Sequence, residues 1–279
     1  MAGTRKPSSD EAVLKNLRKL AGELAESTAN LSGRKATALR KEIGSVVEEL
    51  ARVMEGLDSV KEPESVFDPA NPRTVGRFVG IALVAQDRHP LSLVPAFYGS
   101  GVYALYYDGP FAAYAPIVGS ENPIYVGKAD PANPAAKTPR EQEQRLSGRL
   151  KDHARTVRKA TSTLGIDHFS CRYLVVQSGW QTAAEDYLIN LFKPIWNDEI
   201  RICYGIGKHG DDPGTRGNLR SPWDTLHHGR DWAHRDQNMK DARPSEKILA
   251  DIAAHFKIHA PFATVEAVLK RFFDDLKQR

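Results

Sequence analysis

The sequence contains little cysteine and no long apolar run. Its two cysteines, Cys171 and Cys203, are too few for a disulfide scaffold or a zinc cluster. No apolar segment approaches the roughly 20 residues of a transmembrane helix, and no apolar stretch follows the first residues, as a secretory signal requires. These absences fit a protein of a reducing bacterial cytoplasm, and we expect no membrane partner.

A large excess of charge of one sign is also missing. The chain has 39 Lys and Arg against 35 Asp and Glu, a formal net charge of +4 in 279 residues, and a pI near 8.9. This balance permits nucleic-acid binding but does not argue for it, so the local distribution of charge must decide. A hydrophobic content of 41% supports a packed core and argues against global disorder.

The N-terminal part has the periodicity of two helices over residues 11–57, with Ser32-Gly33 as the expected break. Apolar residues of the second helix alternate steps of four and three, which is coiled-coil spacing: Leu39, Ile43, Val46, Leu50, Val53 and Leu57. A hairpin that closes on itself or on the main body is the favoured interpretation, and a short dimer zipper is the alternative. We expect this appendage to occupy residues 1–62, followed by a proline-containing linker over 63–73.

The remaining sequence predicts an α+β fold: a small three-stranded sheet, antiparallel or mixed, flanked by helices. The expected strands, which are rich in β-branched and aromatic residues, are 99–107, 124–127 and 169–176. The expected helices are one that includes Val75, then 139–160, then 181–193, which Pro194 ends, and two more within 245–279. We expect the main domain to span residues 74–245, with a loop-rich part at 199–243, and C-terminal helices to fill 246–279.

Two glycine–tyrosine motifs lie on the first two expected strands. They are Gly101-Val102-Tyr103 and Tyr125-Val126-Gly127. Because side chains alternate along a strand, Tyr103 shares a face with Leu105 and Tyr107. If the two strands pair, both motif tyrosines point into one pocket. Aromatic residues are common on strands, but glycines beside them indicate that the backbone closely approaches other atoms.

Further polar residues follow on the two expected helices. Arg149 and His153 are four residues apart and share a helix face with Arg145, although a basic helix alone is more often a solvated face. Glu185 stands near a helix start, where a carboxylate can hold a hard cation or simply face the helix macrodipole. Asn197 follows twelve residues later, where an Asx-turn is the alternative.

This set of residues resembles the GIY-YIG nuclease superfamily, with Val102 and Val126 in place of the isoleucines of its name. The resemblance spans roughly residues 66–245 and is strongest to type II restriction endonucleases, through the runs 97–107 and 221–230. Twenty-one residues separate Tyr103 from Tyr125, whereas most members place the two motifs close together. This departure argues against the homing and repair branches.

The resemblance implies roles for the matched residues. The implied catalytic residues are Tyr103, Tyr125, Arg149, His153, Glu185 and Asn197, the last bracing the site through its amide. Tyr103 is the implied general base for water, Tyr125 binds phosphate, and Arg149 stabilises the phosphorane charge. His153 hydrogen-bonds the tyrosine or the water, and Glu185 is the ligand for Mg²⁺ or Mn²⁺. Because a free phenol has a pKa of about 10, Tyr103 needs help from a cation or from the imidazole.

Candidate DNA contacts lie mainly in the loop-rich part. Its arginines and asparagines are of the types that contact guanine and adenine edges, and its interspersed acids favour a folded, sequence-reading loop over a non-specific patch. A surface loop without function has a similar composition. The candidate contacts are Lys128, Arg145, Arg201, His209, Arg216, Asn218, Arg220 and Arg230.

We therefore expect a Mg²⁺-dependent restriction endonuclease that cuts double-stranded DNA at a palindromic site, with water attack assisted by tyrosine and histidine at one divalent metal ion. The resemblance implies a GC-rich site of the CCGCGG kind, a homodimer with a twofold axis and functional pairing with a DNA methyltransferase. The alternatives are a structure-specific repair or recombination nuclease and a non-catalytic DNA-binding protein of the same fold. The former would need accessory domains, and intact catalytic residues count against the latter.

Overall fold

The computed structural model describes residues 9–28, 31, 33–60, 63, 66–207, 219–234 and 239–277. The chain divides into two compact units, Met1–Val66 and Phe67–Arg279, and each is considered by itself. No helix within the described residues is both long enough and apolar enough to cross a membrane.

The first unit consists of two helices, α1 (Ser9–Thr28) and α2 (Gly33–Leu57), as the periodicity predicts. Gly33 begins α2 with φ near +66°, a conformation that glycine adopts without steric cost. No described residue of α2 is buried, and apolar residues of its stripe such as Leu50 and Val53 are exposed. Of the predicted break, Ser32 lies outside the described residues.

The second unit is built on a four-stranded antiparallel sheet. Its strands are β1 (His89–Pro90), β2 (Gly101–Tyr107), β3 (Tyr125–Ala129) and β4 (Phe169–Val175), in the order β1-β4-β2-β3. The expectation of three strands is corrected by β1, whose two residues are too few to show a periodicity. Its proline is tolerated because β1 is an edge strand. The other edge strand is β3, and this position decides where the functional residues meet.

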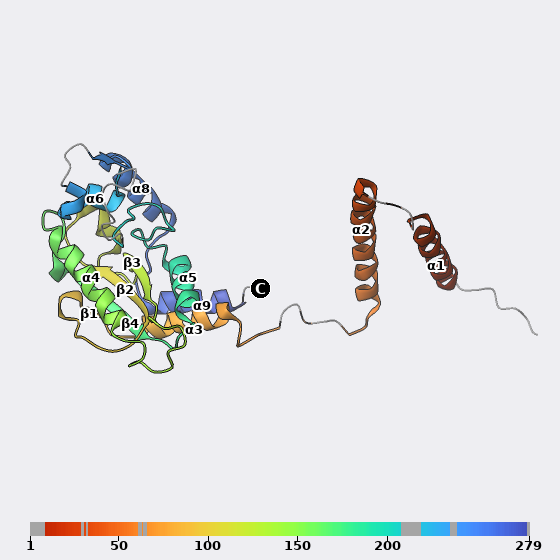
Figure 1. Cartoon of the computed structure of the whole chain (residues 1–279), viewed down its shortest axis with the longest axis horizontal. Helices are drawn as coiled ribbons and strands as arrows, with labels where there is room; N and C mark the ends of the chain where they lie inside the picture. The colour runs from red at the N-terminus through yellow and green to blue at the C-terminus, as the bar shows by residue number, and fades with distance from the viewer. Residues whose placement is uncertain are drawn as a thin grey trace, which may run out of the picture. The chain divides into compact units, whose positions relative to one another are not determined.

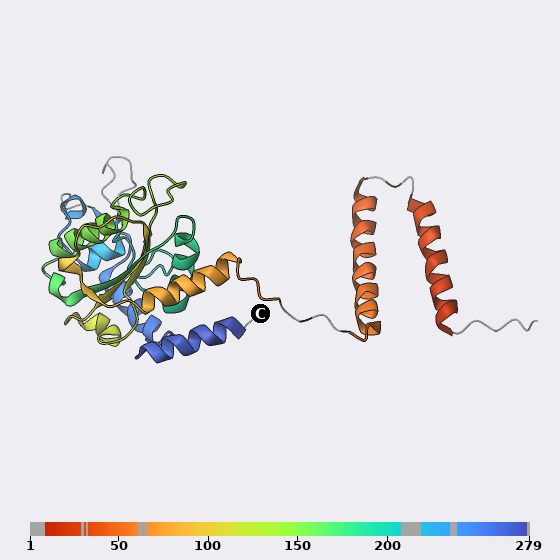
Figure 2. The same ribbon diagram turned by 90° about the horizontal axis from the view of Figure 1, so that it is seen from below.

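The two faces of the sheet are covered by different helices (Figure 1). Tyr103 and Leu105 of β2 lie in one core cluster with residues of α4 (Arg145–Lys159). Val102 and Ala104 lie in the other, with residues of α3 (Pro72–Val84) and α5 (Gln181–Phe192). The predicted alternation along β2 is therefore confirmed. On the second face, α9 (Val265–Lys277) runs beside α3 (Figure 2).

Further elements surround these, and several of them contribute residues to the core of the α4 face. They are η1 (Leu91–Leu93), η2 (Ala112–Ile117), η3 (Ile166–His168), α6 (Pro222–Leu226), α7 (Asp231–His234), α8 (Ser245–Ile258), and the parallel pair β5 (Leu219–Arg220) and β6 (Lys240–Asp241). The segment between the two tyrosine motifs is part of this core, because fully buried Tyr114 accepts a hydrogen bond of 2.9 Å from Trp196 Nε1.

Helix α4 begins at Arg145, six residues later than predicted. Glu143 has a positive φ of 60°, and its carbonyl accepts from Gly99 N at 2.7 Å. The buried side chain of Gln142 accepts from Ser100 N at 2.9 Å. These residues are thus held at the start of β2 instead of extending the helix, because long-range hydrogen bonds override their local helical preference.

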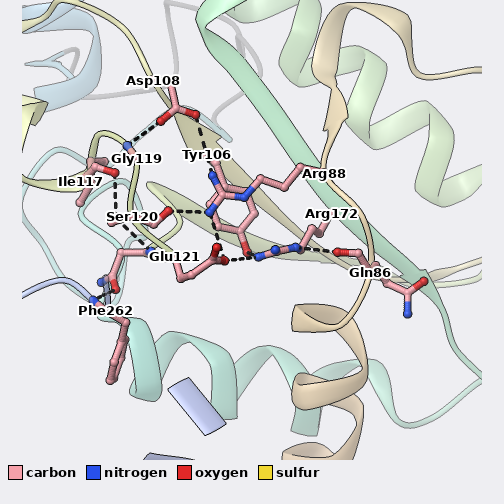
Figure 3. A network of polar contacts seen from close by, with 11 residues as sticks. Gln86, Arg88, Tyr106, Asp108, Ile117, Gly119, Ser120, Glu121, Arg172 and Phe262 are labelled. Carbon is pink, nitrogen blue, oxygen red and sulfur yellow. Dashed lines mark hydrogen bonds and ion pairs between the residues drawn. The ribbon is translucent and has the colours of Figure 1, made fainter. Parts of the chain in front are cut away.

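A buried polar network joins the elements on the α3 side of the sheet (Figure 3). Arg172 of β4 is 7% exposed. Its guanidinium donates to Glu121 at 2.5 Å, to Tyr106 Oη at 3.1 Å and to Gln86 O at 2.7 Å. Glu121 also pairs with Arg88 at 3.1 Å. Because a buried charge must be paired, the network fastens the segment before β3 to the sheet, on the face opposite Tyr103.

Candidate active site

The register of β2 and β3 brings the two motif tyrosines together. Tyr103 pairs with Gly127 across the strands, so Tyr103 and Tyr125 lie on one face, and their ring centroids are 6.1 Å apart. A Cβ on Gly127 would lie 2.5 Å from Tyr103 Oη, and one on Gly101 would lie 2.0 Å from Leu174 O. The predicted close approach at both glycines is confirmed, and it makes room for the phenol.

Helix α4 presents His153 to this tyrosine pair. The apolar residues of α4 recur at helical intervals and are buried. Their burial turns the side of the helix that carries His153 toward the tyrosines. His153 is 2% exposed, and its Nε2 lies 2.7 Å from Tyr103 Oη. Its ring centroid is 5.0 Å from that of Tyr125. The histidine therefore contacts both tyrosines.

Burial keeps the two phenols protonated at neutral pH. It raises the pKa of Tyr103 well above the usual 10.0, and it also raises the pKa of Tyr125. The charge of Arg149 acts in the opposite direction on both. A proton that leaves Tyr103 can pass directly to His153 when Nε2 of that ring is unprotonated. The bond is thus suited to proton transfer that a lone phenol could not perform.

Arg149 supplies a fixed positive charge beside the tyrosines. Burial by itself lowers the pKa of this half-buried guanidinium, but Tyr103 and Tyr125 more than compensate, so the pKa is raised. Its side chain also hydrogen-bonds Tyr103. A charged guanidinium held in place is able to bind a phosphate through two N–H groups.

Glu185 of α5 approaches the site from the other face of the sheet. Its half-buried carboxyl has a pKa raised to about 7, first by burial and then by acids including Glu199, while Lys128 lowers it. Glu185 raises the pKa of Tyr125, whereas Arg149 lowers it, so Tyr125 lies within electrostatic reach of both. Arg149 and Glu185 both act on Tyr125 because β3 is an edge strand, and α4 and α5 contact it from opposite faces of the sheet.

The carboxyl of Glu185 fits a hard divalent cation. Burial and neighbouring acids raise its pKa although Lys128 lowers it, so a bound cation would stabilise the charged form of this carboxyl. No group of three or more His, Cys, Asp or Glu side chains able to hold a metal occurs within the described residues. Mg²⁺ keeps several waters and binds through one or two carboxylates together with substrate phosphates, so this single carboxylate suits Mg²⁺ or Mn²⁺ better than a closed zinc site.

Asn197 braces the strand that carries Tyr125. It is 3% exposed. Its Oδ1 accepts from Val126 N at 2.9 Å, and its Nδ2 donates to Val126 O at 2.8 Å. The amide thus takes the place of a neighbouring strand at the β3 edge, where unpaired backbone groups would otherwise remain. The resemblance implied that Asn197 braces the site through its amide, and the two hydrogen bonds of this amide go to the backbone of β3.

Three of the candidate DNA contacts are exposed or partly exposed. Lys128 Nζ donates to Thr182 Oγ1 at 2.7 Å and pairs with Asp130 at 3.2 Å. Exposed Arg145 donates to Asp130 O at 3.2 Å. Arg201 is exposed, with a positive φ of 56°. These three cations are compatible with phosphate contact in this conformation.

The remaining candidates differ in their placement. Arg220 is half-buried, and its Nη1 pairs with Asp241 at 2.6 Å. Arg230 is 5% exposed and forms an ion pair of 2.6 Å with Asp224, which argues against the expected DNA contact from this position. The reason is physical: its guanidinium would have to leave a fully buried carboxylate unpaired. His209, Arg216 and Asn218 lie outside the described residues.

Sequence reasoning missed one neighbour of the site. A Cβ on Gly207 would lie 3.4 Å from Arg149 Nη2 and 3.8 Å from Tyr125 Oη, so this backbone forms a wall beside both side chains. A glycine on its own carries no such signal. The run at 221–230, already noted for its resemblance to restriction endonucleases, was the available pointer, because it contacts the adjoining residues.

A comparison with known protein families shows the family of this chain. The family model described as the Eco29kI GIY-YIG domain matches residues 95–256. No curated protein matches the chain. The matched range includes both tyrosine motifs, the arginine and histidine of α4, and the carboxylate of α5. Because the match covers more than half of the chain and holds the whole site, the protein belongs to the Eco29kI GIY-YIG family of restriction endonuclease domains and is a nuclease of that fold.

Proposed function

We propose that the protein is a site-specific endonuclease that hydrolyses phosphodiester bonds in double-stranded DNA with Mg²⁺ or Mn²⁺. The observation that carries the proposal is the position of Tyr125. In addition to burial, the charge of Arg149 lowers its pKa and the charge of Glu185 raises it, so both groups lie near this phenol. A cationic group, a phenol and a carboxylate at one strand edge can together serve phosphodiester hydrolysis, because a guanidinium binds phosphate and a carboxylate holds a hard divalent cation. A DNA-binding protein without catalysis has no need for this arrangement.

The chain's own residues divide the chemistry. Arg149 binds the non-bridging phosphate oxygens and stabilises their growing negative charge, and Tyr125 donates a hydrogen bond from its phenol to the same phosphate and keeps its proton. Tyr103 accepts a proton from the attacking water as it passes its own to Nε2 of His153, 2.7 Å away. A positioned acid–base pair supplies about 10²–10⁴ in rate, whereas enzymes reach about 10⁶–10¹⁷, so charge stabilisation has to supply much of the acceleration.

Glu185 would hold the divalent cation. When bound, the cation supplies Lewis-acid stabilisation of charge on the phosphate and on the leaving oxygen. The half-buried position of Glu185 strengthens this interaction, since water screens charges less there than at the surface.

The target is proposed to be palindromic and GC-rich, of the CCGCGG kind. One chain carries one site, so cutting both strands of a symmetric sequence favours a homodimer with a twofold axis. A paired DNA methyltransferase would protect the host. Lys128, Arg145 and Arg201 are proposed to contact phosphates, and Arg220 is a further candidate. His209, Arg216 and Asn218 remain candidates for base contacts.

Incubation with plasmid DNA tests the proposal. The expected result is a set of discrete fragments with Mg²⁺ or Mn²⁺ and none with EDTA, and run-off sequencing then reports the site and the cut position. Cleavage confined to branched or damaged DNA would instead favour the repair nuclease. Absence of cleavage with every divalent ion would favour a non-catalytic DNA-binding protein. Light scattering of the protein, free and bound to DNA, checks the homodimer.

A further inference from the structure

A buried ion pair joins two residues of the 221–230 run. Arg230 donates from Nε to Asp224 Oδ1 and from Nη2 to Asp224 Oδ2, both at 2.6 Å. Ser221 Oγ donates to the same carboxylate at 2.6 Å. Asp224 is 0% exposed. The pair is therefore bidentate and removed from water, the geometry in which an arginine is held most rigidly.

The same guanidinium also binds the backbone of a distant segment. Arg230 Nη2 donates to Gly205 O at 2.8 Å, and Nη1 donates to Ile206 O at 3.2 Å. The Arg230 Cζ atom lies 4.7 Å from the ring centroid of Trp223 and 5.0 Å from that of Trp232. One side chain thus links a carboxylate to two consecutive carbonyl groups.

Those two carbonyl groups directly precede the wall of the active site. A Cβ on Gly207 would lie 3.4 Å from Arg149 Nη2, within contact distance. Gly205 has φ near +109°, and a Cβ on it would lie 2.5 Å from Ser221 Oγ. Residues 205–207 therefore lie between the buried ion pair and Arg149, tightly packed against Ser221 at one end and in contact with Arg149 at the other.

The same run also fastens onto α4, the helix that carries Arg149. Gly229 approaches its C-terminal end so closely that a Cβ would lie 1.7 Å from Lys159 O. His227 lies between Tyr114 Oη, 2.6 Å from its Nε2, and Thr163 Oγ1, 2.9 Å from its Nδ1. Wall and helix are thus held by a single short stretch of chain.

We propose that Asp224 and Arg230 are positioning residues of the nuclease site: they fix the backbone of residues 205–207 against Arg149 and thereby keep its guanidinium aligned with the two tyrosines. The inference rests on the proposed function of that site. A buried ion pair adds little stability over apolar residues of similar size, so stability alone does not account for this one.

Two variants disrupt the bidentate pair between Arg230 and Asp224 while keeping side chains of similar size. Arg230→Lys keeps the positive charge but cannot bind a carboxylate and two carbonyls in one plane, and Asp224→Asn removes the negative charge. The matched controls are Arg172→Lys and Glu121→Gln, which alter the other buried pair, on the opposite face of the sheet (Figure 3). We expect the variants of both ion pairs to lose comparable stability, so thermal unfolding provides a common reference.

Single-turnover cleavage of an oligonucleotide containing the site measures the effect. We expect Arg230→Lys and Asp224→Asn to lower the cleavage rate by roughly 10- to 100-fold, since a misplacement of about 1 Å costs on this order. DNA affinity in Ca²⁺ should stay near that of the wild type. The control variants should lose melting temperature but keep the wild-type rate. A rate loss in the controls that matches the loss in Arg230→Lys at equal melting temperature would overturn the proposal.

Hydrogen–deuterium exchange gives a readout that does not depend on cleavage. Amides of residues 205–207 should exchange faster in Arg230→Lys and Asp224→Asn than in the wild type, and should be unchanged in the two control variants. Unchanged exchange in all four variants would refute the positioning role even if the wild-type protein cleaves DNA. Faster exchange in a protein that cuts no DNA would leave the positioning geometry supported and the nuclease proposal rejected.

Discussion

Tyr103 and His153 are 50 residues apart in the sequence, yet the phenol oxygen of one lies 2.7 Å from Nε2 of the other. The bond connects the central strand β2 to helix α4 inside the core. Because burial raises the pKa of the phenol, the imidazole is the group that makes proton transfer from Tyr103 feasible. The chemistry proposed for the site depends on this contact.

Removing the Tyr103 hydroxyl should disable cleavage without unfolding the protein. Tyr103→Phe keeps the buried ring and loses the proton acceptor, so the single-turnover rate should fall by about 10²–10⁴. Tyr173→Phe is the matched control, because Tyr173 pairs with Tyr103 across β2 and β4 and is assigned no part in the reaction. Equal rates for the wild type and Tyr103→Phe would exclude the proposed role.

Glu185→Gln should abolish metal-dependent cleavage and preserve DNA binding. Added Mg²⁺ should raise the melting temperature of the wild type and not that of the variant, because only the carboxylate binds the cation. Asp186→Asn is the control: this exposed neighbour points about 100° away around the helix, so it should cleave normally. Loss of DNA binding in Glu185→Gln would indicate a structural role for the carboxylate.

The raised pKa of Glu185 predicts two opposite pH dependences. The folded value is about 7 against a usual 4.5, so between these pH values the folded state binds more protons than the unfolded state. Stability of the metal-free protein from this group is therefore present below about pH 4.5 and is lost as the pH rises to about 7. Cleavage at low Mg²⁺ should instead increase through this range, because protons compete with the metal.

Melting temperatures and single-turnover rates measured across this range check both trends. The difference in melting temperature between the wild type and Glu185→Gln should change with pH, and more Mg²⁺ should move the midpoint of the rate profile to lower pH. A midpoint that does not respond to Mg²⁺ would assign the titration to another group.

Gly127→Ala should disrupt the site by direct steric conflict. The added Cβ would lie 2.5 Å from Tyr103 Oη, and overpacking of a core costs about 1–3 kcal/mol. Gly148→Ala on α4 is the matched control, since its Cβ would meet no heavy atom within 4 Å, and alanine in a helix interior adds about 0.5–1 kcal/mol. Denaturant unfolding of both variants tests the contrast, and a Gly127→Ala protein as stable and active as the wild type would contradict it.

Binding measurements should separate phosphate contacts from base contacts. Arg145→Ala should weaken binding about equally on all sequences and reduce the salt slope by about 1, whereas Arg216→Ala should cost about 1–3 kcal/mol at the cognate site and relax discrimination there. Arg220→Ala should lose less discrimination than Arg216→Ala if its pair with Asp241 persists on DNA. Titrations over a range of salt with cognate and altered sites test this. Unchanged discrimination in Arg216→Ala would remove its proposed role.

Several elements were predictable because their patterns are local. The two-residue period along β2 placed Tyr103 with Leu105, and the four-residue interval on α4 placed Arg149 beside His153. The misses have long-range causes. The late start of α4 comes from hydrogen bonds between residues 142–143 and the start of β2. The two-residue strand β1 exists through its pairing with β4.

The sequence by itself determined which side chains share a face, because backbone geometry sets the period of strands and helices whatever the surroundings. Only the tertiary structure decided that β3 is an edge strand, so that Arg149 from one face and Glu185 from the other act on the same tyrosine. It also decided that Arg230 lies in the interior with Asp224. The edge position of β3 and the burial of Arg230 both depend on which residues, far apart in the sequence, pack together in the core. The local spacing of residues along the chain does not determine this packing.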